Sequence, residues 1–168
     1  LHTTCRRQRQ MCIRDSMGSE ARMNYTMMGD NVNTAARLES SAKQYGIYIQ
    51  IADSTYQAVK EKVVVRDLDN VRVLGKNEPV KVWELISEVG QEPGQYKKIL
   101  PAYHEALDLY KTQEWSKAID AFKASDELEE MFGGRKTNPS RIYIPRCEHY
   151  LENPPGEDWD GVWTLTSK

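Results

Sequence analysis

The sequence has few cysteines and histidines, no long hydrophobic run and no strong excess of charge of either sign. The formal net charge is −2, so the whole chain offers no electrostatic reason to expect nucleic-acid binding. No stretch approaches the roughly 20 apolar residues that cross a bilayer, and no membrane span is predicted. The three cysteines form no CxxC pair and leave one unmatched, which favours a reducing, intracellular setting.

The sequence also has neither a P-loop nor a glycine-rich dinucleotide fingerprint, which argues against the common α/β nucleotide-binding folds. What it does have is enough apolar side chains for a core, at 39% of 168 residues. That length suits one ordinary domain, or one partial domain with an appendage.

Residues 1–16, "LHTTCRRQRQMCIRDS", differ from the rest of the chain. They hold four arginines and one acid, with almost no periodic apolar pattern. A basic arm or a targeting peptide is one interpretation, but the segment lacks the apolar region of a secretory signal. The string "MCIRDS" is typical of translated sequencing adapters. We therefore expect residues 1–16 to be an artefact or disordered, and the fold to begin near Met17.

Residues 17–87 alternate between strand-like and helix-like patterns, which predicts an α+β domain. The expected elements are a strand within 21–28, a helix from about 30 to 45, a strand at 47–51, a short helix at 54–62, a strand at 63–68 and a hairpin at 71–86. Local signals set their bounds: a turn at Gly18–Ser19, a helix N-cap at Asp30 or Asn31, a helix-ending Gly46, a capping box from Ser54 to Gln57, and a turn at Asp69–Asn70.

Two polar residues of the helix at 30–45 stand out. Its apolar positions (32, 35, 36, 38, 42 and 45) occupy one broad arc at about 100° per residue. Asn33 and Arg37 are four positions apart and point away from the centre of that arc. They share a polar face and could reach one ligand together. The alternative is an ordinary solvated helix face.

After the Gly- and Pro-containing linker at 88–95, the chain reads as helical. Apolar stripes predict two helices with a break near 112–114, which would form an αα-hairpin. Asn138 and Pro139 predict the cap and first turn of a third helix, in which Pro145 should cause a kink or a late start. We expect residues 96–152 to form this helical appendage and 153–168 an irregular tail.

The string "MGSEARMNYTMMGDNVNTAARLESSAKQYG" resembles the central signature of the class III nucleotidyl cyclases, the adenylate and guanylate cyclases. "LDNVRVLGKNEPVKVWEL" is similar to the hairpin that ends their catalytic domain. The resemblance covers residues 17–87 in register. It implies the C-terminal half of a ferredoxin-like class III cyclase domain, followed by the small helical appendage.

The resemblance implies an adenylate cyclase that converts ATP to 3′,5′-cyclic AMP and pyrophosphate in intracellular signal transduction. It assigns Asn33 and Arg37 as catalytic residues that contact the ribose and the triphosphate. A guanidinium fork can neutralise charge on phosphoryl oxygens, and an amide can orient the ribose for in-line attack. Thr26 occupies the position that selects the purine, and a threonine there resembles the adenine-selecting members; an ordinary strand threonine is the alternative.

Lys76 is the other candidate substrate-binding residue. The family's phosphate-contacting lysine commonly stands just before a glycine, where this chain has Leu74 before Gly75. Lys76 could substitute for it, or could be a surface lysine in a hairpin turn.

The family uses two Mg²⁺ or Mn²⁺ ions, which clamp the attacking and leaving oxygens. Their aspartate ligands belong to segments that would precede Met17, and we assign no metal ligand within this chain. The site forms between two protomers of a homodimer, so the expected partners are ATP and a second cyclase protomer. We expect this chain alone to be inactive and its full-length parent to be active.

The helical appendage looks like one tetratricopeptide-like hairpin, and "DWDGVWTLTSK" is similar to the ends of bacterial cyclases that carry a CHASE2 sensor and membrane helices upstream. The resemblance implies a cytoplasmic portion of a membrane-anchored parent, with membrane contact only through upstream segments. A non-catalytic, degenerate cyclase-homology module with a helical-repeat scaffold role is the alternative function. Two aspartates in the upstream sequence would favour the enzyme.

Overall fold

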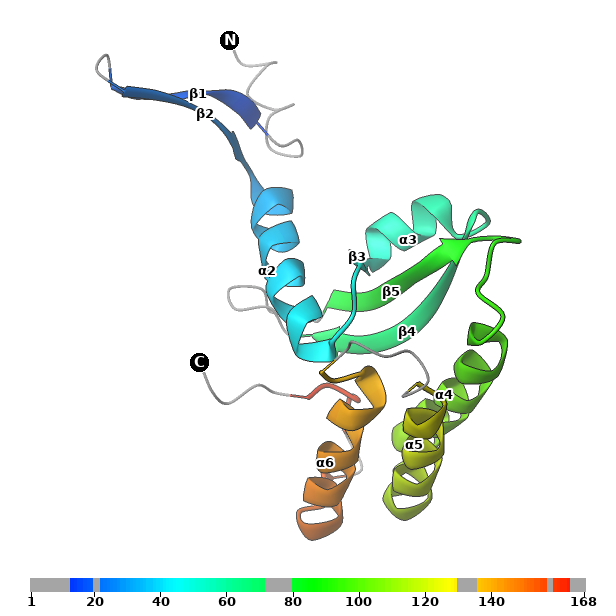
Figure 1. Ribbon diagram of the computed structural model, residues 1–168. Coiled ribbons are helices and arrows are strands. Elements are labelled where there is room, and N and C mark those ends of the chain that lie inside the picture. Colours follow the sequence, from blue (N-terminus) through cyan, green and yellow to red (C-terminus); the bar gives the residue numbers. More distant parts are fainter. Residues whose placement is uncertain (1–12, 20–21, 72–79, 130–135, 157–158, 164–168) are drawn as a thin grey trace. The chain divides into compact units, whose positions relative to one another are not determined.

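The computed structural model describes residues 13–19, 22–71, 80–129, 136–156 and 159–163. Side chains before Gly29, and those of residues 30 and 31, lie outside this description. The chain divides into two compact units, residues 1–41 and 42–168, which we describe separately. Its described parts combine a small antiparallel sheet with helices, as expected for an α+β protein (Figure 1).

The first unit begins with a β-hairpin. Strand β1 (Ile13–Ser19) pairs antiparallel with β2 (Arg22–Met28), with Ile13 opposite Met28. The turn expected at Gly18–Ser19 is wrong, because both residues lie within β1. The last residues of the segment expected to be an artefact or disordered, from Ile13 on, belong to this strand, and residues 1–12 lie outside the described residues.

Helix α2 (Asp30–Tyr45) follows β2 directly (Figure 1). The backbone carbonyl of Gly29 accepts hydrogen bonds from the amides of Val32 (3.1 Å) and Asn33 (3.2 Å), so the helix is initiated at Gly29 rather than at the expected Asp30 or Asn31 cap. Gly29 has a φ of 140°, a conformation that side chains with a Cβ rarely adopt. The helix itself is confirmed.

The C-terminal end of α2 belongs to the second unit and is closed by Gly46, as predicted. Gly46 has a φ of 66°. Its amide donates to the Lys43 carbonyl at 3.3 Å, and the Ile47 amide donates to the Ala42 carbonyl at 3.1 Å. This pair of bonds is the Schellman motif, which satisfies the carbonyls that the helix leaves open.

Gly46 cannot be replaced without strain. A Cβ at this position would lie 2.2 Å from the Thr137 carbonyl oxygen, in addition to the left-handed backbone. We expect Gly46→Ala to lower the free energy of unfolding by more than about 2 kcal/mol. Gly90→Ala is the matched control, because Gly90 also has a positive φ of 87° but a Cβ added there would have no atom within 4 Å. Urea unfolding of both variants measures the difference, and equal losses would contradict the close approach.

The second unit contains a three-stranded antiparallel sheet in the order β3–β5–β4, from β3 (Gln50–Ala52), β4 (Val63–Val71) and β5 (Val80–Glu88). Of the hairpin expected at 71–86, the pair Val71 opposite Val80 is formed, and residues 72–79 lie outside the described residues. The rest of β5 pairs with residues 63–70, which had been expected to form a separate strand and a turn. The turn expected at Asp69–Asn70 is wrong: β4 continues through both residues, with a register shift between Asp67 and Asp69. A bulge thus replaces the turn.

Helix α3 (Asp53–Val59) follows β3. The expected capping box at Ser54 is wrong, since the helix begins at Asp53 after Ala52 and has no side-chain cap bond. The Asp53 carboxylate accepts hydrogen bonds from Gln57 Nε2 (3.3 Å) and from the Trp83 indole nitrogen of β5 (3.0 Å). Asp53 therefore ties α3 to the sheet.

Three helices follow: α4 (Tyr96–Lys111), α5 (Trp115–Glu129) and α6 (Pro139–Glu152). Helices α4 and α5 form the predicted hairpin (Figure 1), and the break falls at 112–114, where Gln113 has a φ of 62°. The Asn138 side chain accepts from the Arg141 amide at 3.0 Å, so the predicted cap is confirmed. Helix α6 starts at Pro139 and continues through Pro145, which rules out a late start.

These helices share one apolar core, rich in aromatic rings. Its buried residues are Tyr103, Ala106, Leu107, Tyr110, Trp115, Ala118, Ile119, Phe122, Tyr143, Cys147 and Tyr150. Trp159 and Trp163, beyond the last helix, pack against this core; the Trp159 ring lies 5.2 Å from that of Tyr110. The described residues of the tail, 153–156 and 159–163, form no helix or strand, and some of them contribute to the core. None of the described helices is long and apolar enough to span a membrane.

Candidate nucleotide-binding site

Helix α2 carries Asn33 and Arg37 on its solvent-exposed face. Both side chains are exposed, whereas Val32 and Leu38 are half-buried and Ala42 and Tyr45 are buried. Residues four apart on a helix are neighbours on its surface. The predicted apolar arc is confirmed only in part, because Ala35 and Ala36 are exposed. The Asn33 amide and the Arg37 guanidinium lie on adjacent turns at the surface.

Thr26 lies in β2, opposite Asp15 of β1 and three residues before Gly29. Thr26, Asn33 and Arg37 thus come from two consecutive elements of the same unit. The Thr26 side chain, and Lys76 with its neighbours Leu74 and Gly75, lie outside the described residues. The structure consequently does not test the roles predicted for Thr26 and Lys76.

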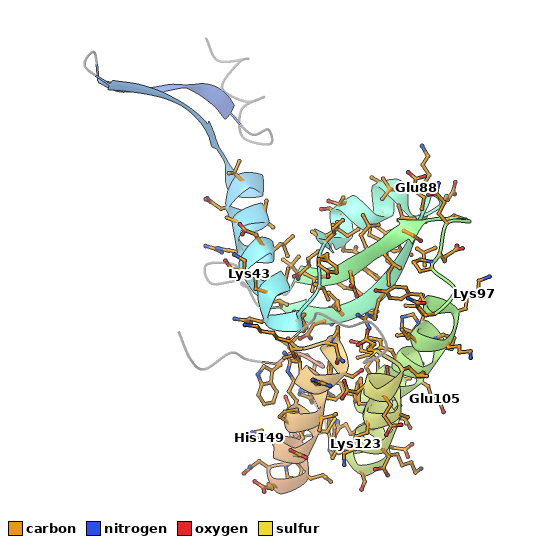
Figure 2. All side chains as sticks on the ribbon, viewed as in Figure 1. Lys43, Glu88, Lys97, Glu105, Lys123 and His149 are labelled. Carbon is orange, nitrogen blue, oxygen red and sulfur yellow. The ribbon has the colours of Figure 1, made fainter. Side chains whose placement is uncertain are left out.

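Within the described ranges, no group of three or more His, Cys, Asp or Glu side chains could hold a metal ion. Lys43 lies on α2, two positions before its end (Figure 2), and its side chain is exposed. It provides a second cationic residue of the same helix against which the role of Arg37 can be measured.

The sheet carries a buried charge cluster that the sequence patterns did not indicate. Arg66 of β4 is fully buried, and its Nε and Nη2 donate to Glu84 Oε2 of β5 over 2.8 and 2.5 Å. Its Nη1 donates to Glu129 of α5. Burial lowers the pKa of Arg66, but Glu84 and Glu129 raise it more, so the net direction is upward. Arg66 therefore stays charged and bonds the sheet to α5.

A second cluster missed from the sequence joins α2, β4 and α6. Asp69 accepts hydrogen bonds from Tyr45 Oη (2.5 Å) and Arg146 Nη1 (2.6 Å). One signal existed for the first cluster: Arg66 and Glu84 are direct cross-strand partners once the register is known. No comparable signal identified Asp69, whose residue type favours a turn.

Comparisons with known proteins show what the chain is similar to. The family model of the adenylate and guanylate cyclase catalytic domain matches residues 11–87, so this segment is similar to part of such a catalytic domain. The match begins before Met17, the expected start of the fold. The chain is 36% identical over 135 residues to the terminal-differentiation-specific adenylate cyclase of Dictyostelium discoideum, covering 78% of this chain and 6% of that protein.

Adenylate cyclase 1 of Rhizobium meliloti is 32% identical over 74 residues, covering 44% of this chain and 11% of that protein. The crystal structure of the adenylyl cyclase CyaB from P. aeruginosa aligns with a TM-score of 0.41 at 30% identity, over 49% of this chain and 41% of that one. This chain thus spans a small part of the length of its curated relatives. The Dictyostelium match covers 78% of this chain, whereas residues 11–87 make up less than half of it. The match therefore extends beyond the linker into the helices that follow it.

Proposed function

We propose that the segment before the linker contributes Asn33, Arg37 and Thr26 to the active site of an adenylate cyclase, which converts ATP to 3′,5′-cyclic AMP and pyrophosphate. The observation that carries this proposal is the exposed Asn33/Arg37 pair on one face of α2, within a segment that matches a cyclase catalytic domain. Adenine is favoured because the curated relatives are named adenylate cyclases.

Each residue has a distinct task in the proposed reaction. The ribose 3′-oxygen attacks the α-phosphorus while the bond to the pyrophosphate oxygen breaks. Arg37 bonds the phosphoryl oxygens on which charge builds, and its planar fork fixes their orientation. The Asn33 amide holds the ribose so that attack is in line. Thr26 donates to and accepts from the adenine edge, and Lys76 is a further candidate for phosphate contact.

When bound, two divalent cations, Mg²⁺ or Mn²⁺, would supply positive charge near the attacking and leaving oxygens. We assign their ligands to a second cyclase protomer and none to the described residues. The exposed position of Asn33 and Arg37 fits this division, since a site completed by a partner requires both groups to be accessible in the single chain.

A complementation assay tests the proposal. This chain is mixed with a class III cyclase domain that carries the two metal-binding aspartates but has alanine at the positions equivalent to Asn33 and Arg37. We expect cyclic AMP from the mixture and none from either component alone, with Mg²⁺ or Mn²⁺ present.

Circular dichroism first verifies that both components are folded, and light scattering that they associate. A folded, associated mixture that makes no cyclic AMP would contradict the proposal and favour the alternative of a non-catalytic scaffold module. Product formed by this chain alone would contradict the assignment of the metal ligands to a partner.

A further inference from the structure

The helix that carries Asn33 and Arg37 ends in a buried polar cluster to which the last helix contributes. Tyr45, the final residue of α2, is 4% exposed, and its hydroxyl donates to Asp69 Oδ2 over 2.5 Å. Arg146 of α6 donates from Nη1 to the same oxygen over 2.6 Å and from Nη2 to the Tyr45 hydroxyl over 3.2 Å. The three side chains form a closed triangle of hydrogen bonds.

The guanidinium of Arg146 is fixed on its other sides as well. It lies 5.0 Å from the centre of the Tyr143 ring and 5.3 Å from that of Trp163, within the range of cation–π attraction. The Tyr143 hydroxyl donates to the Leu68 carbonyl next to Asp69. Burial lowers the pKa of Arg146, but Asp69 and Tyr45 raise it more. A charged planar guanidinium held this way sets the position of Asp69 and Tyr45. A lysine at this position could not reproduce the two N–H donors that the guanidinium directs at them.

We propose that Arg146 is a positioning residue for the proposed cyclase site: through Asp69 and Tyr45 it fixes the end of the helix that presents Asn33 and Arg37. This inference rests on the proposed function. Helix α2 is continuous from Asp30 to Tyr45, and the turn that Arg146 contacts is hydrogen-bonded along the helix to the turns that carry the pair.

Two variants test the triangle: Arg146→Lys, which keeps the charge but loses the fork, and Tyr45→Phe, which keeps the ring but loses the hydroxyl. We expect each to raise hydrogen exchange of the amides at residues 42–47 about tenfold. In the complementation assay, kcat should fall about tenfold, because misplaced groups impair the reaction more than binding, and KM for ATP should change less than twofold. The double variant should be no worse than the single ones, because both break the same triangle.

Arg141→Lys is the matched control. Arg141 also lies on α6 and pairs with an aspartate, Asp126, over 2.8 Å, but its described partners lie outside α2. It should leave both exchange and kcat unchanged. Unchanged exchange at 42–47 in Arg146→Lys and Tyr45→Phe, faster exchange with unchanged kcat, or an equal effect of Arg141→Lys would each overturn the proposal. If the wild-type mixture makes no product, the proposed function fails and the positioning role with it, while the exchange result still shows whether the triangle restrains the helix end.

Discussion

Replacement of Arg37 by alanine should lower the rate of cyclic AMP formation in the complementation assay by at least about a hundredfold, which is the scale on which a single group that stabilises transition-state charge contributes. Arg37→Lys should restore little of this rate, because an ammonium supplies charge without the bidentate fork. Since the Arg37 side chain is exposed, neither change should alter the melting temperature by more than about 2 °C.

Lys43→Ala serves as the control for Arg37, because it removes an exposed cation from the same helix. It should leave the rate within about twofold of wild type, as expected for a surface substitution away from the site. Equal rate losses in Arg37→Ala and Lys43→Ala would mean that α2 acts only through its overall charge. A fully active Arg37→Ala variant would contradict the catalytic role of Arg37.

Replacement of Arg66 by methionine should produce the largest loss of stability, about 3–5 kcal/mol in the free energy of unfolding. The physical reason is that the change removes the shared cation of two buried acids, Glu84 and Glu129, which are 2% and 8% exposed. The two carboxylates lose the hydrogen bonds from this guanidinium and must then either remain charged in a low-dielectric environment or take up protons. Urea unfolding at neutral pH measures the loss.

The exposed pair of Lys117 and Glu114 provides the control for Arg66. Lys117→Met should change the free energy of unfolding by less than about 1 kcal/mol, because exposed ion pairs contribute little. If Arg66→Met prevents folding altogether, Glu129→Gln retains the shape of the side chain and should still destabilise the chain by more than about 1 kcal/mol. A loss below about 1 kcal/mol in both Arg66→Met and Glu129→Gln would contradict the buried charge cluster.

Periodicity and capping residues predicted much of the fold. The helix at 30–45 was recognisable because its apolar positions repeat at helical spacing, and Gly46 marked its end. Asn138 and Pro139 marked the start of α6 equally well, since both residue types suit only a few positions of a helix. These signals are local, and the sequence alone is sufficient to read them.

The errors have a common physical origin in tertiary structure. Asp69 and Asn70 favour turns by themselves, but the pairing of β4 with β5 and the bonds from Tyr45 and Arg146 hold Asp69 in a strand. Arg66 resembles a solvent-facing residue of an alternating strand until α5 covers it. The exposure of Asn33 and Arg37 was predictable because it depends on one helix. The buried clusters depend on several elements that meet only in the folded chain.

The most direct test of the account is a crystal structure of this chain bound to a metal-carrying cyclase protomer and a non-hydrolysable ATP analogue. The account predicts that the Arg37 guanidinium lies within hydrogen-bond distance of the triphosphate oxygens and the Asn33 amide within hydrogen-bond distance of the ribose. A bound nucleotide whose phosphates are contacted by other residues, with Arg37 and Asn33 facing solvent, would contradict it.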